Sequence, residues 1–145
     1  MTPVFASDEE ALAAAEAAYR KYTAVSDQIF HEGGNGAQRL SEVATGDLLE
    51  VELEGFEQVR KLGYRNTGET AVSAVQLQQY SPSESGEDYV MVYLCEDVSA
   101  VDVLDSTGAS VVSATRPART FFEVSFDYVS GALLVSRKEA WDAGC

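Results

Sequence analysis

Residues 7–34, SDEEALAAAEAAYRKYTAVSDQIFHEGG, predict one long amphipathic helix at the start of this chain. Ser7 can cap the free amides of the first turn, and Glu10, three positions later, completes a capping box. Gly33 and Gly34 stop the helix. Its apolar residues recur at spacings of three and four: Ala11, Leu12, Ala15, Tyr19, Tyr22, Val25, Ile29 and Phe30. A stripe of this length must pack against another part of the protein.

Two shorter helices are expected after the glycine-rich turn, over residues 37–43 and from a Thr45 cap to Gly63. From Thr70 onward the apolar period changes from 3.6 to 2, and β-branched and aromatic residues dominate. This pattern predicts strands at 71–80, 87–98, 101–104, 109–112, 119–129 and 132–138. Short connections rich in turn residues predict antiparallel hairpins.

Helices followed by a run of strands indicate an α+β fold, in which the helix stripes close the concave face of a curved antiparallel sheet. The chain has 145 residues, which is the size of one domain. We therefore expect a single domain over 1–145, with residues 1–6 as the remnant of a linker.

The charge of the chain excludes several partners. It carries 24 acidic and 10 basic residues, a net charge of -14, which repels nucleic acid and anionic membrane surfaces. No apolar run approaches the roughly 18 residues that a membrane-spanning helix needs. We expect no nucleic-acid partner and no membrane span.

The two cysteines bear on the compartment. Cys95 falls in an expected strand, and Cys145 is the last residue. A disulfide between them would attach the chain end to the sheet. In the loop-entropy model it would stabilise the fold by about 4 kcal/mol. The alternative is one buried cysteine and one free terminal thiol. A disulfide favours an oxidising, extracytoplasmic compartment.

Catalytic and metal-binding motifs are missing from the sequence. His31, the only histidine, falls at the end of the first helix and fits a capping or surface role. Residues 33–36 follow a helix and predict a turn rather than a phosphate loop. The acids are interpreted as solvated strand, turn and helix residues rather than calcium ligands: Asp97, Asp102, Asp105, Glu50, Glu52, Glu54 and Glu57. We expect no metal and no cofactor.

The order of one long helix, two shorter helices and a meander of long strands resembles the NTF2-like (cystatin-like) cone. Residues 5–12 (FASDEEAL), 92–99 (VYLCEDVS), Trp141 and Cys145 also resemble a group of uncharacterised actinobacterial secreted proteins and lipoproteins. The resemblance implies a signal peptide and a linker before Thr2, secretion or a lipid anchor, and pairing of two sheets as a route to a homodimer.

The resemblance also implies a pocket between the sheet and the first helix, where a tyrosine and buried acids can transfer a proton. Strand alternation places Glu96 on the same face as Val90, Val92 and Leu94, toward the core. The pocket candidates are therefore Tyr19, Tyr22 and Glu96. For Glu96, a position near the rim at the strand end is the alternative to a role as general base.

The opposite faces of the first two long strands predict a polar and aromatic patch. It consists of Gln76, Gln78, Tyr80, Tyr89 and Tyr93. Such a patch suits contact with a protein better than chemistry. The alternative is a mixed surface, partly covered by the segment of Trp141.

Three functions are consistent with these patterns. The first choice is a non-catalytic extracytoplasmic binding or accessory domain of NTF2-like type, whose partner is an unidentified protein or a small apolar ligand. The second is a small-molecule enzyme that works by proton transfer or hydration with Tyr19, Tyr22 and Glu96. The third is an acidic inhibitor or immunity protein that covers a basic partner, suggested by the charge alone.

Overall fold

The structure, a computed structural model, describes residues 4–83, 88–141 and 144–145. Its helices are α1 (Asp8–His31), the short 3-10 helix η1 (Ala37–Glu42) and α2 (Gly46–Leu62). The strands are β1 (Arg65–Thr67), β2 (Ala71–Ser81), β3 (Tyr89–Asp97), β4 (Asp102–Leu104), β5 (Arg119–Val129) and β6 (Ala132–Trp141). Helices packed on an antiparallel sheet confirm the expected α+β class.

Local signals begin and end α1 where the sequence predicts. The Glu10 amide donates to Ser7 Oγ at 3.2 Å, and the Glu10 carboxylate accepts from the Ala6 amide at 2.8 Å. At the other end Gly34 has a positive φ, and a Cβ there would lie 2.5 Å from the Phe56 carbonyl oxygen. Only glycine lets the end of α1 approach α2 so closely.

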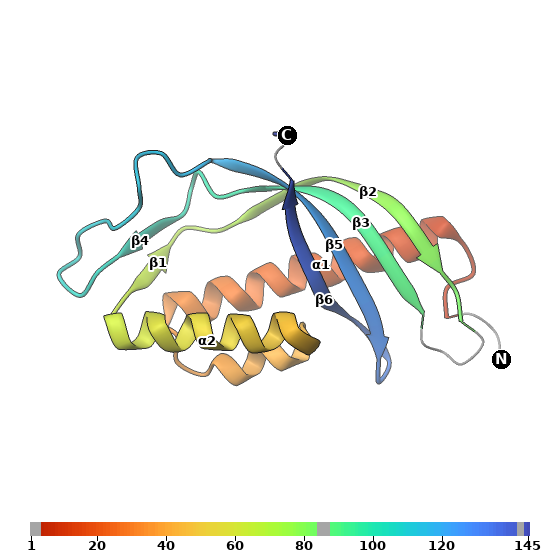
Figure 1. Cartoon of the computed structure of the whole chain (residues 1–145), viewed down its shortest axis with the longest axis horizontal. Coiled ribbons are helices and arrows are strands. Elements are labelled where there is room, and N and C mark those ends of the chain that lie inside the picture. The colour runs from red at the N-terminus through yellow and green to blue at the C-terminus, as the bar shows by residue number, and fades with distance from the viewer. Residues whose placement is uncertain (1–3, 84–87, 142–143) are drawn as a thin grey trace.

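The main sheet has the order β2-β3-β5-β6, with every neighbouring pair antiparallel. Its strands arch over α1, and α2 runs beside α1 on the same side of the sheet (Figure 1). The core lies between these layers and is formed by Ala11, Ala15, Tyr19, Tyr22 and Ile29 of α1 and by Val90, Val92, Leu94, Val124 and Phe126 of the sheet. The face of the sheet opposite the helices, called here the convex face, is not covered by any helix of the described residues (Figure 1).

A second, two-stranded sheet departs from the prediction. β1, which the sequence analysis missed, pairs with β4, so the expected strand 101–104 lies outside the main sheet. The prediction of a strand at 109–112 is wrong, because this segment contributes only an isolated bridge between Ser110 and Leu104. Residues 84–87 lie outside the described residues; they belong to the connection between the expected strands 71–80 and 87–98 and include the first residue of the second.

The folded domain includes residues that the sequence analysis assigned to a linker remnant at 1–6. The Val4 amide donates to Asp88 Oδ2 at 3.1 Å, and the Phe5 ring meets the Tyr80 ring edge-on at 5.7 Å. Val4 and Phe5 therefore belong to the domain. Residues 1–3 lie outside the described residues.

Register irregularities in the edge strands change which side chains face the core. In β2 the pairing with β3 shifts between Ser73 and Gln76 and again between Leu77 and Gln79. In β6 the partner of Ser125 is Arg137, whereas the partner of the next residue, Phe126, is Val135. Because an extra residue reverses alternation, side chains beyond each irregularity exchange faces.

Candidate functional site

A polar cluster lies between α1 and the concave face of the sheet. The fully buried Tyr19 donates its hydroxyl proton to Glu96 Oε2, and Lys138 Nζ donates to the same oxygen at 3.0 Å. The side chains of Lys138 and Glu96 are 17% and 13% exposed. The three groups satisfy one another, which is the condition for keeping charges in a core.

A second pair lies beside this cluster. Tyr22, also buried, donates its hydroxyl proton to Glu52 Oε1 of α2. The Lys138 ammonium lies 5.5 Å from the centre of the Tyr22 ring, 5.6 Å from that of Tyr19 and 4.4 Å from that of Phe122. Cation–π attraction to these faces adds to the ion pair in holding the amine. The two tyrosine–carboxylate pairs thus meet at one lysine.

Burial dominates the electrostatics of this site. It raises the pKa of Tyr19 and of Tyr22 well above the ordinary tyrosine value, with the neighbouring carboxylates Glu96 and Glu52 raising them further. Burial also raises the pKa of Glu52, against the opposing effect of the Tyr22 hydrogen bond and Lys138. Both tyrosines therefore stay protonated at neutral pH and act as hydrogen-bond donors.

An open hollow of about 400 Å³ lies between α1 and α2, next to the second pair. Its polar lining includes Ser26, Glu52 and Lys138. Its apolar lining includes Phe30, Val51 and Phe56, and Gly55 of α2 also borders it. Tyr22 reaches the hollow, whereas Tyr19 and Glu96 do not line it. The hollow therefore gives solvent and ligands access to Glu52, whereas the Tyr19–Glu96 hydrogen bond lies outside its lining.

The structure brings together the three predicted pocket residues Tyr19, Tyr22 and Glu96, and it adds two that the sequence analysis missed. Lys138 is missed because strict alternation from Val135 directs it to the convex face, and the irregularity in β6 returns it to the core side. Glu52, expected on the wet face of its helix, is half-buried and bonded to Tyr22. Its place beside Phe56 on the helical projection was a usable signal.

The remaining polar candidates have local roles. His31 Nδ1 lies 2.9 Å from the carbonyl oxygen of Asn66, so this histidine joins the end of α1 to β1. The Asp105 carboxylate accepts from the amide and hydroxyl of Thr107 within its turn. Among the residues that the structure describes, no group of three or more histidine, cysteine or acidic side chains could hold a metal ion.

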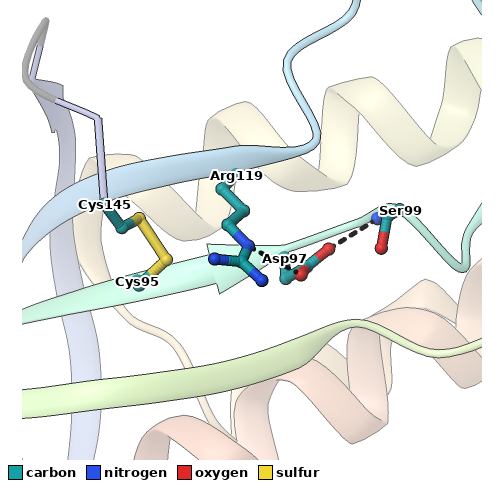
Figure 2. Close-up of a disulfide and its surroundings, with 5 residues drawn as sticks. All are labelled: Cys95, Asp97, Ser99, Arg119 and Cys145. Atoms are coloured by element: carbon teal, nitrogen blue, oxygen red, sulfur yellow. Dashed lines mark hydrogen bonds and ion pairs between the residues drawn. A yellow bond between two sulfur atoms is a disulfide. The ribbon is translucent and has the colours of Figure 1, made fainter.

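The chain end is attached to the sheet by a disulfide between Cys95 and Cys145, whose Cα atoms are 5.9 Å apart. Figure 2 shows this bond next to the end of β3, where Asp97 accepts from Arg119 Nε at 3.1 Å and from the Ser99 amide at 2.8 Å. The side chain of Cys95 is nearly inaccessible to solvent.

The predicted surface patch is divided by the irregularities of β2. Gln76 pairs with Tyr93, and Tyr89 donates to Ser125 Oγ at 2.9 Å, all on the convex face. Tyr80 instead pairs with the core-facing Val90 and bonds to Asp88, which corrects its assignment to the patch. The exposed Gln78 is the extra residue at the second irregularity.

A ring cluster occupies the convex face close to the disulfide. Tyr93 stacks on Phe121 at 5.4 Å, and Trp141 meets both rings edge-on at 5.5 and 5.9 Å. Trp141 is 45% exposed. The segment of Trp141 thus covers part of this surface, which is the alternative that the sequence analysis left open.

Comparisons with known proteins show the fold alone. No family model and no curated protein matches the chain. Among solved structures, the intermembrane space region of the chloroplast protein ARC6 is similar with a TM-score of 0.63 and 14% identity, over 89% of this chain and 95% of that one. A periplasmic fragment of TraM is similar with a TM-score of 0.56 and 13% identity, over 90% and 97%. Both similar structures are thus domains from extracytoplasmic or intermembrane compartments.

None of the helices in the described part of the chain combines the length and the apolar character that crossing a membrane requires.

Proposed function

We propose that this chain is a non-catalytic binding or accessory domain of NTF2-like type that works outside the cytoplasm, as part of a secreted protein or lipoprotein. The proposal rests on the interior of the fold. The residues that would perform proton transfer in such a cone, Tyr19 and Glu96, bond to each other and to Lys138.

The position of the Tyr19–Glu96 hydrogen bond, outside the lining of the open hollow, is the observation that carries the proposal. A general acid or base must come within hydrogen-bond reach of its substrate. Tyr19 is fully buried, and Glu96 Oε2 accepts hydrogen bonds from both Tyr19 and Lys138. The cluster therefore suits a stabilising role inside the scaffold, and the surfaces of the domain are left to bind.

Two observations support the compartment. A disulfide ties Cys95 to Cys145, and structural disulfides persist mainly in oxidising compartments. Two of the similar solved structures are a periplasmic fragment and an intermembrane space region.

The experiment follows the thiols in the native host. The tagged full-length gene product is separated into fractions and alkylated under denaturing conditions before and after reduction. We expect the protein outside the cytoplasmic membrane, with both thiols reacting only after reduction. A Cys145→Ser variant is the matched control, because its single Cys95 thiol should react at once. Reactive thiols on wild-type protein in the cytoplasmic fraction would contradict the proposal.

A small enzyme that transfers protons is the second candidate, favoured by the raised pKa of Glu52 beside the open hollow. A carboxyl of this kind is a reasonable general acid or base. The test substrate is a β,γ-unsaturated ketosteroid, whose isomerisation needs only a proton transfer. We expect no turnover; turnover that is lost in Glu52→Gln would replace the first proposal with this one.

A further inference from the structure

The apolar stripe of α2 is wider than the surface that the rest of the chain covers. Phe56 lies in the core, but Val51 and Leu62 are 64% and 55% exposed. Gly55 falls on the same line of the helix as these two residues. Val51, Gly55 and Leu62 are called here the uncovered stripe.

Gly55 is an unusual residue for this position. A glycine inside a helix costs about 1 kcal/mol relative to alanine. Its φ is not positive, and a Cβ built on it would meet no atom within 4 Å. The fold of this chain therefore gives no reason for a missing side chain at Gly55. The hollow between α1 and α2 opens beside it, so a chain lying there could approach the backbone of α2 closely.

Carboxylates border the uncovered stripe on both sides. On the helical projection Asp47 and Glu54 follow one flank, and Glu54 lines the surface next to Val51 and Gly55. Glu52 follows the other flank, where only one of its oxygens, Oε1, accepts a hydrogen bond within the described chain. The basic residues of α2, Arg60 and Lys61, lie in its last turn, where Lys61 borders the same surface as Glu54.

An apolar stripe with Asp47 and Glu54 on one flank and Glu52 on the other is complementary to an amphipathic helix with basic flanks. We propose that the groove between α1 and α2 binds a basic amphipathic helix of a partner protein, whose apolar residues cover Val51 and Gly55 while a lysine or arginine reaches Glu52. This inference deepens the proposed binding function and rests on it. A second copy of the chain is a poor occupant, because each copy carries a net charge of -14.

The test uses a synthetic peptide of about 16 residues, which is long enough to form a helix. Its leucines recur every three or four positions, so that they share one face of the helix, and lysines occupy the other positions. Calorimetry measures its binding to the whole chain. A peptide with the same composition in scrambled order and a leucine–glutamate peptide are the controls. We expect saturable binding of the first peptide alone, weakened by salt because screening reduces attraction between opposite charges.

Two variants locate the site. Gly55→Leu fills the groove at a position with open space around it, so we expect a folded protein that binds the peptide at least about tenfold more weakly. Ala13→Leu, at an exposed position of α1 away from the groove, is the matched control and should bind as wild type does. Glu52→Gln keeps an oxygen for Tyr22 and should weaken binding without changing circular dichroism.

Several outcomes would overturn this inference. They are absence of saturable binding at about 1 mM peptide, equal binding of all three peptides, and no effect of Gly55→Leu. Self-association of the wild type that Gly55→Leu abolishes would instead make a second copy the occupant.

Failure of this inference and failure of the proposed function are separable. A partner that cross-links to the ring cluster around Trp141 in the extracytoplasmic fraction would keep the function and reject the groove. Reactive thiols in the cytoplasmic fraction would reject the function while leaving the peptide measurements in place.

Discussion

Lys138 Nζ lies 3.0 Å from Glu96 Oε2, and the ammonium is surrounded by the rings of Tyr19, Tyr22 and Phe122. The ion pair connects β6 to β3, two strands that are not neighbours in the sheet. It therefore closes the concave side of the sheet across β5, and several measurable properties depend on it.

Removing the cation should destabilise the fold. In Lys138→Met the stem packs as before, but Glu96 is left in the core with Tyr19 as its only described partner. Breaking a buried pair in this way costs roughly 3 kcal/mol. Urea unfolding at neutral pH measures the loss. Lys138→Met combined with Glu96→Gln should recover part of it, because the side chain at position 96 then carries no unpaired charge; a double variant less stable than Lys138→Met would contradict this account.

Reduction of the disulfide should lower stability by about 4 kcal/mol, the entropy of closing a loop over a separation of 50 residues. Urea unfolding with and without a reducing agent measures the difference. A Cys95→Ala, Cys145→Ala variant should unfold like the reduced protein and be insensitive to the reducing agent. Equal midpoints for oxidised and reduced wild type would show that the bond stabilises nothing.

Stability should fall with rising pH as Glu52 ionises. Burial raises the folded pKa of Glu52 above the ordinary value of 4.5, so the folded state binds more protons than the unfolded state between the two values. Stability from this group is therefore complete below pH 4.5 and is lost as pH rises through the folded pKa. Unfolding across this range should show a smaller decline in Glu52→Gln than in wild type. An identical decline in both proteins would assign it to other groups.

Alkaline pH should unfold the protein through its buried tyrosines. The pKa values of Tyr19 and Tyr22 are raised well above the ordinary value of 10.0, so above that pH these side chains ionise in the unfolded chain first. Their contribution to stability is complete below pH 10 and lost above it. Ultraviolet absorbance of tyrosinate should rise in two steps, the second coinciding with loss of circular dichroism. Ionisation of all seven tyrosines in the folded protein would disprove the burial.

The irregularities of the edge strands explain why part of the site could not be predicted. Alternation correctly placed Glu96 with Val90, Val92 and Leu94, because β3 pairs with β5 without any shift. The same rule failed for Tyr80 on β2 and would have failed for Lys138 on β6. Both follow a register shift that strand periodicity does not reveal.

The periodicity of the sequence also could not predict which distant segments pair with each other. β1 has three residues and forms its sheet with β4, far along the chain, so it leaves almost no periodic signal. The segment 109–112 has strand-like residues but forms only an isolated bridge, from Ser110 to Leu104 of β4. Residue preferences indicate what a segment can form, and the available partner decides whether it does.

The sequence by itself determined the long capped helix, its glycine stop, the change to strands after Thr70 and the antiparallel pairing of the long strands, because capping, periodicity and turn chemistry are local. Only the tertiary structure decided that Lys138 joins Tyr19 and Glu96, and that α2 leaves Val51 and Gly55 uncovered. These features arise when edge strands absorb extra residues and when a helix has more apolar surface than its neighbours cover, and both depend on packing between segments far apart in the chain.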